Sequence, residues 1–312
     1  MKGLLRLGAT LLGLFLFLEL GVDWIAPQKS MEQLAREEPT ARDILKEPAQ
    51  TVDVLILGDS ESYSAFTPMQ LWKDTGCTAY VCGTCGQQLC DTEQLLYQAF
   101  QTQSPKVVLL ETNALYRRVS LRRLACSWVE AALAGLQGQG ETERDSTAQA
   151  LSSAGTVDIW KGFRCNTKIK SGSGGDYMHP TGERASIPKR NRRYLERIKA
   201  FCDARQARLI LVSTPSTVNW NTGRHNGVQA LAEELGVTYV DLNLGQVDID
   251  WSTDTRDRGD HLNYYGAVKV TRSLGEYLKT LDVLTDHRTD PAYAPWNQAL
   301  EGYEAAVEEA DG

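Results

Sequence analysis

A serine follows a short apolar stretch in the first third of the chain. Residues 52–57 read Val-Asp-Val-Leu-Ile-Leu, and Gly58-Asp59-Ser60-Glu61-Ser62 come directly after them. A run this apolar predicts a buried central strand, and Gly58 permits a tight turn at its end. If a helix begins at this turn, its free N–H groups point toward Ser60 and could hold an oxyanion. Ser60 is therefore a candidate nucleophile; the alternative is that it only caps the helix.

A serine nucleophile needs a base, and histidine is the usual one. The chain has four histidines, and among them His261 lies in the carboxylate-rich sequence Asp-Arg-Gly-Asp-His-Leu-Asn at residues 257–263. A carboxylate within reach of the ring would fix its tautomer and stabilise the imidazolium. His261 is therefore the candidate base; the alternative is an exposed histidine in a polar loop.

Alternating apolar and helical segments indicate how these residues are positioned. Strands alternating with helices predict a parallel sheet covered on both faces, in which functional groups gather at the carboxyl ends of the strands. The expected strands are 52–57, 78–81, 106–110, 207–212 and 237–240, and the expected helices are 91–101, 117–136, 192–204, 225–235 and 265–280. The rule points to residues 59–61, 82–87, 111–113, 213–216 and 241–243 as the site.

Four of these segments resemble, in order, the sequence blocks of the SGNH (GDSL-type) hydrolase superfamily. The four segments, Gly58-Asp59-Ser60, Cys82-Gly83-Thr84-Cys85-Gly86-Gln87, Glu111-Thr112-Asn113 and Asp260-His261-Leu262-Asn263, span about residues 52–280. The resemblance implies a three-layer, flavodoxin-like α/β fold and activity on acyl esters. It also implies that an N–H of Ser60, an N–H of Gly86 and the amide of Asn113 form the oxyanion hole.

The chain departs from this family at the acid of the triad. The acid usually lies three residues before the histidine, and Arg258 occupies that position here. Asp257 is about one turn from His261 if the segment is helical, whereas the side chain of Asp260 would tend to point elsewhere. We therefore favour Asp257 over Asp260, with Asp254 as a third candidate.

The two ends of the chain differ from the middle. Lys2 and Arg6 precede an uncharged apolar run, residues 7–18, which predicts a membrane anchor over 1–27; a cleaved signal peptide is the alternative, and both would export the domain. We expect a linker at 28–50, the hydrolase-like domain at 51–280 with a surface loop at 137–155, and an acidic tail with a helix at 281–312. The apparent anchor, the Gly58-Asp59-Ser60-Glu61 start and the Asp260-His261-Leu262-Asn263 end together resemble bacterial envelope proteins of the teichoic-acid D-alanyl transfer type and SGNH partners of membrane-bound O-acyltransferases.

These features predict an extracytoplasmic serine esterase or acyltransferase that acts on acyl esters of a cell-envelope glycan or polymer. It would need no metal or organic cofactor, and a formal net charge of −7 argues against a nucleic-acid partner. The first alternative is a non-catalytic scaffold that assists a membrane-bound O-acyltransferase. The second is a thiol- or metal-based protein, because four of the seven cysteines fall between Cys77 and Cys90. Asn219-Trp220-Asn221 follow the fourth strand and are candidates to line the pocket. Trp220 could stack on a sugar there, and a packing role is the alternative.

Overall fold

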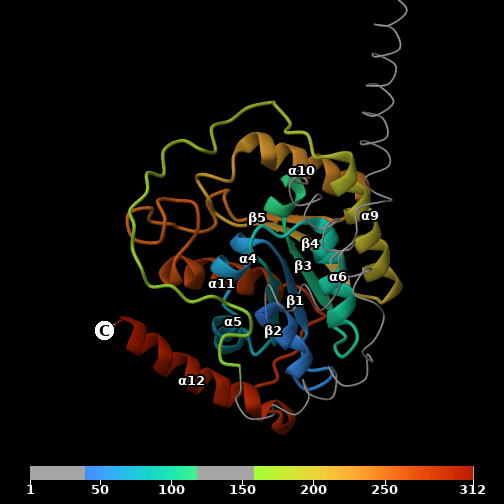
Figure 1. The fold of residues 1–312 in the computed structure, drawn as a ribbon, viewed down its shortest axis with the longest axis vertical. Coiled ribbons are helices and arrows are strands. Elements are labelled where there is room, and N and C mark those ends of the chain that lie inside the picture. Colours follow the sequence, from blue (N-terminus) through green and yellow to red (C-terminus); the bar gives the residue numbers. More distant parts are fainter. Residues whose placement is uncertain (1–38, 118–157, 312) are drawn as a thin grey trace, which may run out of the picture.

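A five-stranded parallel sheet forms the centre of the protein (Figure 1). The computed structural model describes residues 39–117 and 158–311. The strands lie in the order β2-β1-β3-β4-β5, and every neighbouring pair is parallel. Their bounds are β1 (Val54–Gly58), β2 (Ala79–Gly83), β3 (Val107–Glu111), β4 (Arg208–Ser213) and β5 (Thr238–Asp241). This is the flavodoxin-like strand order, so the predicted parallel α/β sheet is confirmed.

Strand β1 is apolar along its length because it contributes to two cores. Side chains alternate across a strand, so Leu55 and Leu57 pack into one hydrophobic cluster, whereas Val54 and Ile56 pack into the other. All four side chains are essentially inaccessible to solvent. A strand covered on both faces needs apolar residues at every position, which explains why no polar alternation appears in its sequence.

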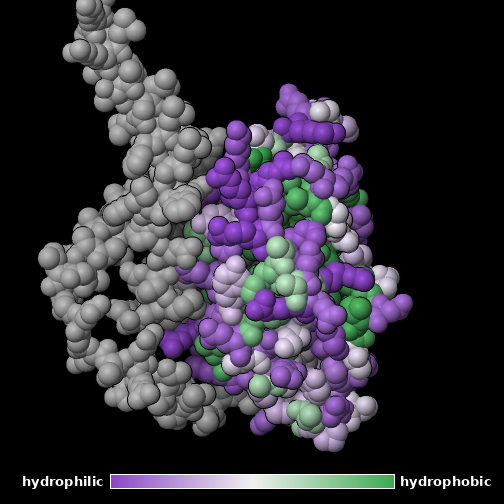
Figure 2. All heavy atoms as spheres, turned by 90° about the vertical axis from the view of Figure 1, so that its right-hand side faces the viewer, coloured by the Kyte–Doolittle hydropathy of each residue, from purple (hydrophilic) through white to green (hydrophobic). Residues whose placement is uncertain are grey.

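Helices cover both faces of the sheet. The face of Leu55 and Leu57 is covered by α6 (Leu89–Ala99), α9 (Lys189–Ala204) and α10 (Thr222–Leu235). The face of Val54 and Ile56 is covered by α4 (Ser60–Ala65), α5 (Pro68–Thr75) and α11 (Tyr264–Lys279). The three layers agree with the predicted arrangement. Hydrophilic residues cover most of the surface around α6 and α9, with hydrophobic side chains in small separate groups (Figure 2).

Helix α5 has no counterpart among the predicted elements, although the sequence marks both of its ends. Pro68 is its first residue, where a missing N–H costs nothing, and Gly76 ends it in the left-handed conformation with φ 71°. The helix predicted from Arg117 is wrong at that residue, because Arg117 has extended backbone after the short 3-10 helix η2 (Thr112–Tyr116). The remainder of that helix, the loop at 137–155 and Cys126 lie outside the described residues.

Segments at both ends of the described chain pack against the sheet domain. In residues 39–50, which fall within the expected linker, α3 (Pro39–Arg42) and η1 (Asp43–Lys46) bury Ala41 and Ile44. In the acidic tail, η3 (Pro291–Tyr293) precedes α12 (Ala294–Asp311), whose Trp296 is buried 5.7 Å from Trp72, centroid to centroid. The tail helix is therefore docked on the domain.

Residues 158–188 run along the outside of the molecule before α9 begins (Figure 1). Near the start of this segment the carbonyl of Lys161 accepts a hydrogen bond from the N–H of Val81, at 2.9 Å. That contact covers part of the open edge of β2, which would otherwise expose unpaired backbone groups.

Within residues 39–117 and 158–311 no helix combines the length and apolarity required to cross a bilayer. The predicted anchor at 1–27 lies outside these ranges.

Candidate active site

The turn between β1 and α4 places Ser60 at the carboxyl edge of the sheet. Gly58 is required there, because a Cβ on it would lie 2.6 Å from the Cβ of Glu111. Asp59 is the N-cap of α4, and its carboxylate accepts a hydrogen bond from the N–H of Glu61 at 3.0 Å. Ser60 is the first residue of the helix, so its hydroxyl is not used for capping. The alternative in which Ser60 only caps the helix is therefore wrong.

His261 connects Ser60 to a carboxylate. Its Nε2 lies 2.8 Å from Oγ of Ser60, and its Nδ1 lies 2.6 Å from Oδ2 of Asp257. The other carboxylate oxygen of Asp257 accepts a hydrogen bond from the backbone N–H of His261, also at 2.6 Å. Asp257 thus holds both the ring and the backbone of His261, which fixes the ring orientation toward Ser60.

A tight loop, rather than a helix, brings Asp257 to His261. Thr255 and Leu262 form an antiparallel bridge that closes residues 255–262 into this loop. Arg258 and Gly259 both have positive φ, 71° and 96°, and turn the chain back on itself. The predicted contact between Asp257 and His261 exists, but the helical spacing from which it was predicted does not.

The other two candidate acids lie in different surroundings. Asp260 has Oδ2 3.6 Å from Nδ1 of His261, and its Oδ1 accepts a hydrogen bond from the amide of Asn219. Asp254 is buried and forms an ion pair with Lys269 at 2.6 Å. Of the three carboxylates, Asp257 makes the short contact with the ring.

The two residues expected to complete the oxyanion hole lie on different loops at this edge. Asn113 is in η2, where its amide nitrogen donates to Asp59 at 2.9 Å and its amide oxygen accepts from Arg224 at 3.0 Å. One of its two amide hydrogens is therefore engaged by Asp59. Gly86 lies between β2 and α6 with φ 60°, and a Cβ on it would have no atom within 4 Å. The space beside Gly86 is open.

Buried carboxyl groups surround the Ser60 turn. Burial raises the pKa of Glu61 and of Glu111 well above the ordinary value, and the nearby charge of Asp59 raises both further. Arg117 donates a hydrogen bond to Asp59 and supplies positive charge from the end of η2. Arg256 donates to the hydroxyl of Ser64 at 2.8 Å, with its Nε 3.9 Å from Asp257.

Sequence reasoning missed the three arginines at this edge, Arg117, Arg224 and Arg256. The available signal was position: Arg117 lies shortly after the end of β3, Arg224 is on the helix that follows β4, and Arg256 lies in the loop that carries His261. Their contacts to Asp59, Asn113 and Ser64 connect separate loops of the site.

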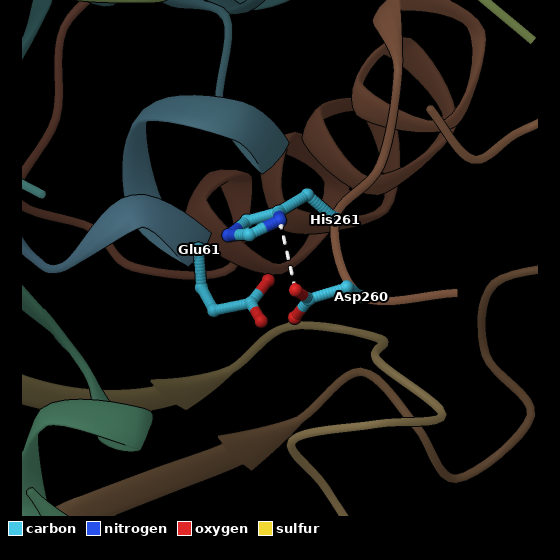
Figure 3. Close-up of side chains that lie close together, drawn as sticks. All are labelled: Glu61, Asp260 and His261. Atoms are coloured by element: carbon cyan, nitrogen blue, oxygen red, sulfur yellow. Dashed lines mark ion pairs between the residues drawn. The ribbon is translucent and has the colours of Figure 1, made fainter. Parts of the chain in front are cut away.

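Three side chains at this edge could hold a metal ion. Glu61, Asp260 and His261 each offer a ligand atom, and these atoms lie within 4.8 Å of one another (Figure 3). Both ring nitrogens of His261 already face other groups, Ser60 and Asp257. Cys77, Cys82 and Cys202 are buried free thiols, and Cys85 is exposed.

Trp220, expected to line the pocket, packs inside the protein. It is 3% exposed, and its indole N–H donates to Asp241 at 3.0 Å. His225 contacts the same carboxylate through Nδ1 at 2.7 Å. Trp220 is therefore a buried anchor rather than an exposed stacking platform.

The sequence matches no family model and no curated protein. Among solved structures similar to this chain, several are described as lipases, acylhydrolases or esterases, the class that the sequence motifs resemble. A GDSL-like lipase from Bacteroides thetaiotaomicron is 12% identical, with a TM-score of 0.41 over 80% of this chain and 99% of that one. A lipase/acylhydrolase from Enterococcus faecalis is 10% identical, with a TM-score of 0.42 over 75% of this chain and 98% of that one. An esterase from Pseudoalteromonas sp. is 12% identical, with a TM-score of 0.39 over 73% and 96% of the two chains.

Proposed function

We propose that this protein is a serine hydrolase that acts on ester bonds, with Ser60 as nucleophile, His261 as base and Asp257 as the acid that orients the base. The observation that carries the proposal is the continuous chain of contacts from Ser60 Oγ through His261 to Asp257, at 2.8 and 2.6 Å. These residues have the chemistry and the mutual geometry of a nucleophile, a base and an orienting carboxylate.

The chemistry follows from these contacts. His261 Nε2 takes the proton of Ser60 as Oγ attacks the acyl carbonyl carbon, and the carbonyl oxygen becomes an oxyanion. The N–H groups of Ser60 and Gly86 and the remaining amide hydrogen of Asn113 would stabilise that oxyanion. The imidazolium then returns its proton to the leaving alcohol, and an acyl-enzyme ester remains on Ser60. Water or a second hydroxyl group, activated by His261 in the same way, removes the acyl group and restores Ser60.

We further propose that the ester lies on a cell-envelope glycan or polymer and that the domain is held outside the cytoplasmic membrane. The support is the sequence before the described residues, where Lys2 and Arg6 precede an apolar run. An acceptor hydroxyl on the polymer would make the enzyme an acyltransferase, and a membrane-bound O-acyltransferase is the partner we propose for that reaction.

The first test treats the full-length protein with a fluorophosphonate probe, which labels activated serines. We expect labelling of the wild type and its loss in Ser60→Ala and in His261→Ala. Ser62→Ala is the matched control two residues away, and it should still be labelled, because the hydroxyl of Ser62 donates to the backbone of Asp59 instead of facing a base. Labelling that persists in Ser60→Ala would mean that another residue is the nucleophile. A folded wild type that is never labelled would favour the scaffold alternative.

The second test addresses substrate and location. An acylated envelope polysaccharide is incubated with the purified full-length protein, and acyl release is compared with acyl movement to an isotopically labelled acceptor sugar. Transfer that depends on Ser60 supports an acyltransferase, whereas release alone supports an esterase. Protease treatment of intact spheroplasts should degrade the domain if it lies outside the membrane, and protection of the domain would contradict that location.

A further inference from the structure

Glu61 follows Ser60 on α4, and its side chain lies under the site instead of in solvent. It is 1% exposed, and its Oε1 accepts a hydrogen bond from the amide nitrogen of Asn219 at 2.7 Å. The same nitrogen of Asn219 donates to Oδ1 of Asp260. One amide group therefore joins the residue after Ser60 to the residue before His261, and we call Glu61, Asn219 and Asp260 the carboxyl bridge.

Asn219 is itself held in place by the loops it connects. Its N–H donates to the hydroxyl of Ser216 at 3.1 Å, and that hydroxyl donates to the backbone carbonyl of Asp260 at 2.7 Å. Arg224 donates to the backbone carbonyl of Asn219. The bridge is therefore a fixed connection between α4, the loop after β4 and the loop that carries His261.

The two carboxyl groups of the bridge face each other (Figure 3). Two carboxylates this close repel if both are charged, so one of them holds a proton. The side chain of Asp260 is 38% exposed to solvent. Glu61 is buried, and its Oε2 has no hydrogen-bond partner among residues 39–117 and 158–311. The proton is therefore expected on Glu61.

The surroundings of Glu61 favour the same assignment. Burial is the largest cause that raises its pKa, the charges of Asp59, Glu111 and Asp260 add to it, and the hydrogen bond from Asn219 opposes the change only in part. Two cations lie beside this group: Arg117 is paired with Asp59, and Arg224 donates to the backbone carbonyl of Asn219. His261 is the remaining titratable neighbour.

We propose that Glu61 and Asn219 are positioning residues that set the spacing between Ser60 and His261, and that they do so only while Glu61 carries its proton. The inference rests on the proposed function. Ionised Glu61 would be a buried negative charge beside Asp59, Glu111 and Asp260. Repulsion would then separate the first turn of α4 from the His261 loop, and the contact between Ser60 and His261 would lengthen.

The experiment measures the rate of fluorophosphonate labelling of the full-length protein from acidic to alkaline pH. The wild type should lose labelling as pH rises through the raised pKa of Glu61. Glu61→Gln keeps the acceptor for Asn219 but cannot ionise, so it should stay active and lack this pH-dependent loss. Glu61→Ala and Asn219→Leu remove the bridge and should label about 10²-fold more slowly, since a displacement of about 1 Å costs that much.

Glu93→Gln is the matched control, because Glu93 is a buried glutamate on α6 that pairs with Arg197 outside the site. Its pH profile should match that of the wild type. The inference is overturned if Glu61→Gln loses labelling with rising pH as the wild type does or if Glu61→Ala labels at the wild-type rate. Loss of wild-type labelling in EDTA would also overturn it, because a metal ion instead of a proton would then neutralise the bridge.

The Tm of thermal unfolding, measured across the same pH range, detects the proton on Glu61 and does not depend on catalytic activity. The folded protein holds this proton above the pH at which an unfolded glutamate releases it, about 4.3. The free energy of unfolding therefore falls as pH rises from that value to the raised pKa. Glu61→Gln should gain in Tm relative to the wild type through this window. An unlabelled wild type with this Tm pattern would refute the proposed function alone, whereas labelling with parallel Tm curves would refute the bridge.

Discussion

Two histidine–aspartate pairs at the carboxyl edge of the sheet have nearly the same geometry and different surroundings. Nδ1 of His261 lies 2.6 Å from Asp257, and Nδ1 of His225 lies 2.7 Å from Asp241. The second nitrogen of His261 faces the hydroxyl of Ser60 at 2.8 Å. The contact that distinguishes the first pair is therefore on Nε2, not on the carboxylate side of the ring.

The two carboxylates also differ. Asp241 is buried and accepts hydrogen bonds from Trp220, Tyr239 and Asn243 besides His225, so it anchors the loops after β4 and β5. The side chain of Asp257 is one-third exposed; its two hydrogen-bond contacts are with His261, and Nε of Arg256 lies 3.9 Å away. A fully satisfied buried carboxylate stabilises a fold, whereas a carboxylate whose hydrogen bonds both go to one histidine positions that histidine. The difference shows that a histidine–aspartate pair alone does not identify an active site.

The difference between the two pairs predicts that His261 is required for ester turnover and that His225 is not. His261→Gln should lower ester turnover by on the order of 10⁶-fold, as loss of the base does in serine hydrolases, while His225→Gln should leave turnover nearly unchanged. Turnover of a small chromogenic ester by the two variants measures this directly. Equal losses in both variants would mean that the contact on Nε2 does not mark the site.

Asp257 and Asp260, the two acids near His261, should contribute differently to turnover. Asp257→Asn should reduce turnover by up to about 10⁴-fold, because the ring loses the partner that fixes its tautomer. Asp260→Asn should cost far less, since its carboxylate lies 3.6 Å from Nδ1 and is bonded to Asn219. The ratio of kcat values for the two variants is the measurement, and a larger loss in Asp260→Asn would reverse the assignment.

Asp241 should matter for stability instead of turnover. Asp241→Asn weakens a buried cluster of hydrogen bonds and should lower the free energy of unfolding by about 1–3 kcal/mol. Asp176→Asn is the control, because Asp176 pairs with His179 in a contact whose side chains are both about three-quarters exposed. Urea unfolding should show a shift for the first variant and none for the second. A large loss of turnover in a folded Asp241→Asn protein would contradict the purely structural role of Asp241.

The smallest effect is a change in acid stability. Burial alone would raise the pKa of Asp241, but hydrogen bonds from His225, Asn243 and Trp220 outweigh it, and the pKa lies below the ordinary value. Asp241 therefore adds stability above the unfolded pKa of about 3.9. That stability is lost as pH falls through the lowered pKa of the folded state. Tm measured against pH should fall more gently on the acid side in Asp241→Asn, and an unchanged slope would contradict the anchoring role.

The sequence alone determined the layers of the fold. A strand with two buried faces must be apolar throughout, as residues 54–57 are, and helices with one buried face must follow such strands, so the alternation predicted the parallel sheet. Local patterns also marked Ser60 and His261. Ser60 lies in a polar turn directly after an apolar strand, and His261 lies in a polar turn directly before a helix. Helix α5 was missed although Pro68 and Gly76 mark its ends.

Only the tertiary structure decided which polar groups meet. Ser60 and His261 are 201 positions apart, and Glu61 and Asn219 are 158 apart, so no local pattern encodes either contact. The choice of Asp257 over Asp260 depended on a loop with positive φ at Arg258 and Gly259, where the sequence suggested a helical turn. Contacts between distant loops are set by how helices and strands pack together, and that packing also buries Glu61 beside Asp59 and Glu111, where a carboxyl group retains its proton.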